Sequence, residues 1–328
     1  CDLESVVTHF CRVTGLSYNP DWKHILRPLT TLQIERQDLY AFFASTMTRY
    51  IPSCPSEHTY QVLRLLLQYH APDLCSFLET KKISPESYAG QWLSTIFAAA
   101  VPRIVLPGIW DVYFQLNDPF LTFFLCLVIL INAKEQLLEM SDASKEEIVQ
   151  TLCSVPAALE VEDVEDFCSL AQHYVSNTPE SFRSQFHALL FPTESEKADD
   201  MDLTPINSLC LSISVGELLR ARSADEQVRY LLVDCRPPDQ YNAGHLPTAF
   251  HLDSELMLRN PAEFQVSAVR CGAVRCGAVR CCVLRCGVVW CGVIRCGAVR
   301  CGAVWCGAVR CDTMRCGVVR CGAVRCCA

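Results

Sequence analysis

The spacing of apolar residues predicts helices along the first 190 residues of the chain. Apolar side chains recur three or four residues apart, as on one face of a helix, and polar or proline-containing breaks separate these segments. The longer predicted helices cover residues 2–14, 38–51, 57–69, 163–175 and 179–190, and shorter ones start near residues 72 and 144. No strand-like alternation occurs before residue 200, so we expect an all-helical domain over residues 1–190 with antiparallel neighbouring helices.

The centre of the predicted core lies in residues 84–138. Two start signals, Ser84-Pro85 and Asp118-Pro119, combine a capping residue with a proline suited to the first helical turn. Residues 119–133 carry no charge, which predicts a helix that is buried on all sides. A membrane span is the alternative, but a bilayer needs about 20 apolar residues and this run is shorter. We therefore expect three packed helices and no transmembrane segment.

The pattern changes after residue 190. Residues 191–208 are polar and acidic, which is typical of a linker. Within residues 209–266, a helix is predicted near residue 214, a short apolar strand at 230–235 and a second strand at 250–252. A helix, a buried strand, a turn and another strand indicate the start of an α/β domain. The expected fold class is mainly α, with an all-helical domain, an incomplete α/β domain and a low-complexity tail.

The tail, residues 267–328, consists of 12 copies of a five-residue repeat of the form AVRCG. Five residues turn a helix by roughly 500°, so successive copies point in different directions, and on a strand an odd period switches faces at each copy. Neither element would gain a core face. We therefore predict that the tail has no stable fold and is a translated simple repeat, an artefact of the gene model. A four-sided β-solenoid is the regular alternative.

The repeat differs from the rest of the chain in both net charge and cysteine content. The repeat carries ten arginines and one aspartate, so the rest of a chain of net charge −8 carries about −17, which disfavours nucleic acid as a partner. Fourteen of the 23 cysteines lie in the repeat, and the other nine are scattered without a CxxC pair. Scattered thiols indicate a reduced, cytoplasmic protein. The histidines do not cluster at metal-ligand spacing, so we expect no metal and no cofactor.

The central helices carry a family resemblance. Trp92 follows a proline-containing helix start, and the triplet Ile109, Trp110, Asp111 precedes the uncharged helix. This order resembles the second half of a TBC domain, the helical module of Rab GTPase-activating proteins. The resemblance implies that these four residues form a structural motif of the family and that a Rab GTPase is a possible partner.

The same resemblance bears on catalysis. Active TBC domains supply an arginine, which neutralises charge on the transferred phosphoryl group, and a glutamine, which orients the attacking water. The family glutamine lies in a Tyr-x-Gln motif, and the matching positions here are Tyr18, Asn19 and Pro20. Proline has no side-chain amide, so we interpret the motif as degenerate. The alternative is an ordinary loop in which a shifted alignment hides the real glutamine, but the nearby Gln33 and Gln37 lie past the apolar helix and fit poorly. The chain starts with Cys1, and we expect the arginine segment upstream; Arg12, Arg27, Arg36 and Arg49 are interpreted as solvated residues.

The second region resembles a rhodanese domain, whose signature is Asp-x-Arg near a strand end followed by Gly-His-Ile-Pro-Gly-Ala. The matching residues are Asp234, Arg236, Gly244, His245, Pro247 and Ala249. Thr248 stands where the family has glycine. The match covers about the first half of such a domain, and the repeat begins before the loop that holds the sulfur-transfer cysteine. Cys235 is interpreted as a buried structural thiol.

A TBC-like domain followed by a rhodanese-like domain resembles a non-catalytic trafficking adaptor. The resemblance implies a cytoplasmic protein, peripheral at the trans-Golgi network, that helps capture endosome-derived vesicles through golgin tethers. It implies that the WASH complex is reached only through a C-terminal region absent from this sequence. An active Rab GTPase-activating protein is the first alternative, and a sulfurtransferase or phosphatase is the second.

Overall fold

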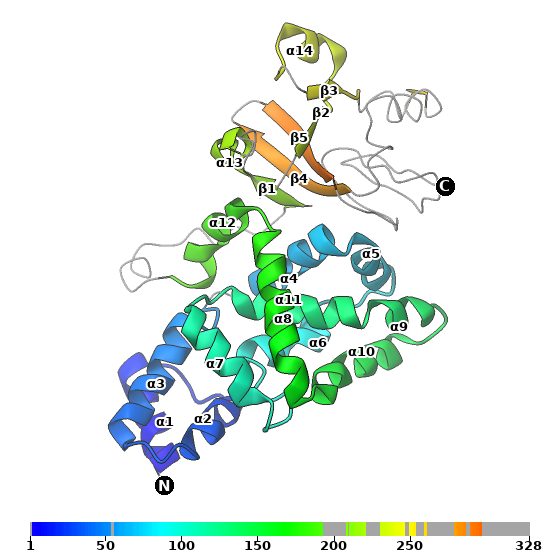
Figure 1. Cartoon of the computed structure of the whole chain (residues 1–328). Coiled ribbons are helices and arrows are strands. Elements are labelled where there is room, and N and C mark those ends of the chain that lie inside the picture. The colour runs from blue at the N-terminus through cyan, green and yellow to red at the C-terminus, as the bar shows by residue number, and fades with distance from the viewer. Residues whose placement is uncertain are drawn as a thin grey trace. The chain divides into compact units, whose positions relative to one another are not determined.

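The computed structural model describes residues 2–53, 56–192, 208, 210–220, 230–246, 249–253, 259–260, 279–286 and 289–296 (Figure 1). The chain divides into two compact units. Unit 1 comprises Cys1–Leu63, Ile83–Ser176 and Phe186–Thr204, and unit 2 comprises Arg64–Lys82, Asn177–Gln185 and Pro205–Ala328. The predicted domain boundary at residue 190 is a boundary in the sequence pattern. The two units are instead groups of residues that contact one another, so each combines segments from different parts of the chain.

The described residues before 193 form helices and connecting turns (Figure 1). The helices are α1 (Asp2–Thr14), α2 (Trp22–Thr30), α3 (Arg36–Arg49), α4 (Ser56–His70), α5 (Pro72–Thr80), α6 (Glu86–Ser94), α7 (Leu106–Leu116), α8 (Leu121–Asn132), α9 (Lys134–Glu139), α10 (Lys145–Ser154), α11 (Val164–Ser176) and α12 (Glu180–Leu190), with the 3-10 helices η1 (Val155–Ala158) and η2 (Val161–Asp163). The expected all-helical architecture of this part is confirmed.

Helix α8 forms the centre of the core in unit 1. Every residue from Leu121 to Leu130 is buried, and the helix packs against α6 and α11. The predicted helix starts are displaced by one or two residues, because Pro85 precedes α6 and the Asp118 carboxylate accepts a hydrogen bond from the Phe120 N–H at 3.1 Å before α8 begins. Among the described residues no helix has the length and apolar character that crossing a membrane requires.

A strained turn between α6 and α7 is held by the predicted TBC motif. Ile96 and Phe97 have φ angles of 47° and 63°, a left-handed conformation that is unfavourable for bulky side chains, and both are completely buried. The Trp110 indole N–H donates to the Ile96 carbonyl at 2.9 Å, and the Trp92 and Phe97 rings stack at 6.2 Å. Packing and this hydrogen bond therefore fix a backbone shape that the local sequence disfavours.

Unit 2 contains a five-stranded sheet of order β1-β4-β5-β2-β3. The strands are β1 (Leu211–Ile213), β2 (Tyr230–Asp234), β3 (Ala249–His251), β4 (Val279–Cys286) and β5 (Val289–Cys296), with helices α13 (Val215–Arg220) and α14 (Pro238–Ala243). The pairs β1–β4 and β2–β3 are parallel, and β4–β5 and β2–β5 are antiparallel. The predicted α/β start is confirmed, and β1 is an additional strand.

Two stretches of the repeat lie in this sheet, which differs from the prediction that the tail has no stable fold. β4 and β5 are both repeat sequence, and they join β1 to β2 through backbone hydrogen bonds (Figure 1). Strand pairing needs only backbone donors and acceptors, so a sequence without a constant core face can still complete a sheet. The rest of the repeat, residues 193–207 of the predicted linker, and Pro247 lie outside the described residues.

Candidate functional site

The loop that carries the degenerate glutamine motif is anchored at both ends. Helix α1 ends where Gly15 adopts a φ of 72°, a conformation that favours glycine. At the other end Trp22 is 5% exposed, and its ring contacts Phe10 and Phe43 at centroid distances of 5.3 and 6.0 Å. Tyr18 lies 6.1 Å from Trp22 and is 56% exposed. The loop is therefore fixed on the core and presents Tyr18 to solvent.

The only side-chain amide of this loop is used locally. The Asn19 side-chain oxygen accepts a hydrogen bond from the Asp21 N–H at 2.9 Å, and the Asn19 carbonyl accepts one from the Trp22 N–H at 3.2 Å. Both bonds close a turn that leads into α2. Pro20 is exposed and contributes no side-chain donor or acceptor. Pro20 therefore offers no amide at the position of the family glutamine, and the oxygen of the Asn19 amide is engaged within the turn.

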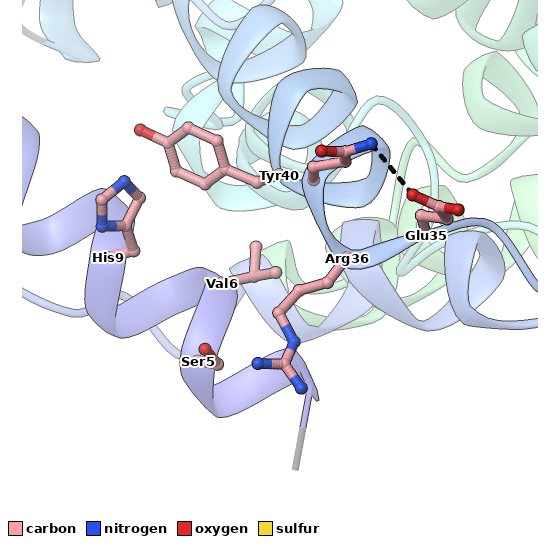
Figure 2. A pocket seen from close by; sticks show the side chains of 7 residues that line it. Ser5, Val6, His9, Glu35, Arg36 and Tyr40 are labelled. Carbon is pink, nitrogen blue, oxygen red and sulfur yellow. Dashed lines mark hydrogen bonds between the residues drawn. The ribbon is translucent and has the colours of Figure 1, made fainter.

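An open pocket between α1 and the start of α3 has a volume of about 790 Å³ and is called the α1–α3 pocket here (Figure 2). Its lining residues are Ser5, Val6, His9, Glu35, Arg36, Gln37 and Tyr40. The Gln37 amide donates to the Glu35 carboxylate at 2.9 Å, and the His9 and Tyr40 rings meet edge to face at 4.7 Å. The pocket holds an arginine and a glutamine side by side, outside the family motif.

A second hollow, called the α2–α7 groove, has a volume of about 750 Å³. Its lining residues are His24, Arg27, Pro28, Leu29, Thr30, Thr31, Leu32, Phe42, Ala98, Arg103, Leu106, Pro107, Trp110, Asp111 and Phe114. The predicted triplet divides between core and groove: Ile109 is completely buried, Trp110 lines the groove at 6% exposure, and Asp111 is exposed beside it. The sequence identified the triplet but not the groove, because the lining residues are far apart in the chain.

The rhodanese-like residues form a closed turn after β2. Asp234 is completely buried, and the Arg236 guanidinium donates to its carboxylate at 3.0 Å from Nε and 2.7 Å from Nη2. The same Nη2 donates to the Gly244 carbonyl at 2.7 Å. Burial alone would raise the pKa of Asp234, but the hydrogen bonds and positive charge of Arg236 outweigh it and hold that pKa below its usual range.

Aromatic stacking completes this turn. The Tyr241 ring lies 3.8 Å from His245 and 4.3 Å from His251, nearly parallel to both, and its hydroxyl donates to the Ala249 carbonyl at 3.1 Å. The structure therefore brings together all described residues of the predicted motif. Their hydrogen bonds hold the turn between β2 and β3 closed. Cys235 follows β2 and is partly exposed, which corrects the interpretation of a buried thiol, because the strand ends one residue earlier.

Sequence reasoning did not identify Glu217, a buried acid at 7% exposure. Its carboxylate accepts hydrogen bonds from the N–H groups of Glu180 and Ser181, both at 2.9 Å, and from the Ser181 hydroxyl at 2.6 Å. A signal was present, because Ser214 and Glu217 have capping-box spacing and the Glu217 N–H donates to the Ser214 hydroxyl at 3.1 Å.

Comparison with known proteins supports both modules. Residues 2–138 match the family model of the Rab-GTPase-TBC domain, and residues 214–270 match that of the rhodanese-like domain. Each of the two resemblances that the sequence motifs predicted is thus matched by a family model over part of the chain. TBC1 domain family member 4 from Mus musculus is 28% identical over 131 residues, which are 40% of this chain and 10% of that protein. The chain thus spans about a tenth of the length of this relative.

Among solved structures, the crystal structure of the Chlamydomonas flagellar RabGAP TBC domain is 18% identical and has a TM-score of 0.44. The alignment covers 53% of this chain and 58% of that chain.

Proposed function

We propose that this chain is a non-catalytic adaptor in vesicle trafficking, whose TBC domain binds partners and does not accelerate GTP hydrolysis. The observation that carries this proposal is Pro20 at the position of the family glutamine. Orientation of the attacking water requires a side-chain amide, and the neighbouring Asn19 uses its amide oxygen to bond the Asp21 N–H. A TBC fold without this group keeps the surface of an activator but lacks one half of its catalytic machinery.

The rhodanese-like region supports the same proposal. Sulfur transfer needs a cysteine held as a thiolate by surrounding backbone N–H groups. Cys235 stands at the end of β2, beside the Asp234–Arg236 pair, and not in such a loop. Outside this region, burial raises the pKa of Cys168 on α11 to about 11 and also raises that of Cys126 on α8, so neither thiol is a ready source of thiolate. We therefore place a sulfurtransferase or phosphatase activity last among the functions considered.

The finer assignment follows from the family resemblance of the two modules together. The adaptor would then act at the cytoplasmic face of the trans-Golgi network, with golgin tethers as its partners in capturing endosome-derived vesicles. A Rab GTPase that binds without being activated fits the same fold.

Single-turnover GTP hydrolysis across a panel of Rab GTPases tests the proposal. We expect the hydrolysis rate of each Rab to stay within about twofold of its intrinsic rate at saturating concentrations of this protein. An arginine and glutamine in place would accelerate hydrolysis by about 10³-fold or more. A known active TBC protein serves as the positive control, and acceleration of that size by this protein would overturn the adaptor proposal.

One observation favours the alternative of an active Rab GTPase-activating protein. Arg36 and Gln37 line the same α1–α3 pocket, so the two residue types that the chemistry needs are adjacent on the surface (Figure 2). Against it, the Gln37 amide is bonded to Glu35. If any Rab is activated, Arg36→Ala and Gln37→Ala should abolish that activation, whereas Arg49→Ala on the same helix should not.

A further inference from the structure

The α2–α7 groove has an apolar floor that is rigidly held. Phe42 and Phe114 meet edge to face at 5.1 Å, Trp110 and Phe114 at 5.7 Å, and the Trp110 N–H is tied to the Ile96 carbonyl. Leu32 lines the groove and is 62% exposed, although it is a large apolar residue. Fixed aromatic walls beside an exposed leucine are typical of a site that takes an apolar side chain.

Basic side chains surround this floor. Arg27 on α2 and Arg103 ahead of α7 are exposed, and among the described residues neither guanidinium has an ion-pair partner. His24 adds a third basic side chain to the lining, and Asp111 is the one acid among the lining residues. Since residues 1–267 carry a net charge of about −17, an excess of basic groups around one groove is a local exception to the acidic character of the chain.

We propose that the α2–α7 groove binds a short peptide segment of a partner protein that combines acidic side chains with one large apolar side chain. The apolar side chain would cover Phe42, Trp110 and Phe114, and a carboxylate would accept paired hydrogen bonds from Arg27 or Arg103. Guanidinium groups bind carboxylates in this bidentate way and retain that ability at an exposed rim. A free phosphate or lipid headgroup would satisfy the arginines but leave the aromatic floor uncovered.

This inference rests on the adaptor function proposed above and names the kind of partner that one surface of the adaptor recognises. The groove differs from the α1–α3 pocket, and it does not include Tyr18 or Pro20. Its volume of about 750 Å³ is in the range of pockets that enclose a few anchoring side chains. Binding would therefore depend on a small number of contacts, with an apolar anchor at the centre and charge pairs at the rim.

The test is a selection of random 12-residue peptides displayed on phage against the full-length chain. We expect enriched peptides to share acidic residues around one phenylalanine, leucine or tryptophan. Fluorescence anisotropy with a labelled enriched peptide should show at least about tenfold weaker binding to the Arg27→Glu, Arg103→Glu double variant. Leu32→Ser should weaken binding severalfold, while Arg49→Glu, an exposed arginine of α3 outside the groove, should have no effect.

Several results would overturn the groove assignment. These are no enrichment, enriched peptides without acidic residues, or peptides that bind the double variant as tightly as the unaltered chain. Self-association in sedimentation velocity that the double variant abolishes would assign the groove to a second copy instead. The two proposals can fail separately, because Rab activation in the hydrolysis assay would overturn the adaptor role while leaving peptide binding measurable.

Discussion

Replacing Asp234 with alanine is expected to destabilise the rhodanese-like turn by about 3–5 kcal/mol, because it leaves the Arg236 guanidinium without its buried counter-charge. The Asp234 side chain is fully buried and that of Arg236 is 14% exposed, so water cannot replace the lost carboxylate. Hydrogen exchange measured by mass spectrometry checks this expectation. The β2 amides should lose protection in the variant, and so should the Leu252 N–H, which bonds the Asp234 carbonyl.

Two control variants distinguish the contribution of the Asp234–Arg236 ion pair from the general effect of replacing a side chain. Asp239→Ala removes an exposed aspartate in the first turn of α14 and should change stability by no more than about 0.5 kcal/mol. Replacing both Asp234 and Arg236 with apolar residues should cost less than Asp234→Ala alone, because no buried charge is left unpaired. Equal protection of β2 in Asp234→Ala and Asp239→Ala would contradict the structural role given to the pair.

The same pair predicts a loss of stability in acid. Although burial opposes ionisation, Arg236 holds the pKa of Asp234 below that of an unfolded aspartate, so the folded state binds this carboxylate's proton less readily. The stabilisation is then fully present above the unfolded pKa of about 3.9 and disappears as pH falls through the lower folded pKa. The free energy of unfolding, measured with urea, should therefore fall more steeply below pH 4 for the original chain than for the double apolar variant. Parallel curves would contradict this.

Features that depend on neighbours in the chain could be predicted from the sequence. The Ser144 capping box is an example, because the Glu147 N–H donates to the Ser144 hydroxyl at 3.2 Å and the Ser144 N–H donates to the Glu147 carboxylate at 2.8 Å. All atoms of this motif lie within four consecutive residues. The end of α1 at Gly15 and the burial of α8 were predictable for the same reason, since each follows from local composition.

Features that depend on packing could not be predicted in this way. The α2–α7 groove needs Arg27, Phe42 and Arg103 to meet, and their separation in the chain gives no signal for that. The left-handed conformation of Ile96 contradicts its own preference and is imposed by buried neighbours and by Trp110. For the glutamine motif, the family resemblance identified Pro20, while the structure added that Asn19 is already bonded to the Asp21 N–H.

Replacing Glu217 with alanine is expected to cost about 3 kcal/mol, because three donors at the start of α12 lose a charged acceptor at once. The carboxylate lies against the first N–H groups of that helix, where the helix dipole also favours a negative charge. Ser181 is doubly affected, because its hydroxyl accepts from the Ser214 N–H at 2.7 Å while donating to Glu217. One substitution therefore disturbs the starts of both α12 and α13.

Glu217→Gln and Arg220→Ala show whether the charge or merely the contact matters. Glutamine keeps the size but offers one neutral oxygen, so we expect a loss of about 1–2 kcal/mol, between those of alanine and the unaltered chain. Arg220→Ala removes the exposed ion pair with Glu180, in which the side chains are 63% and 76% exposed, and should cost no more than about 1 kcal/mol. Thermal unfolding together with hydrogen exchange at residues 180–185 distinguishes the variants. If Glu217→Ala and Arg220→Ala proved equally stable, the buried carboxylate would not be what holds the start of α12, and its hydrogen bonds would contribute no more than the surface pair.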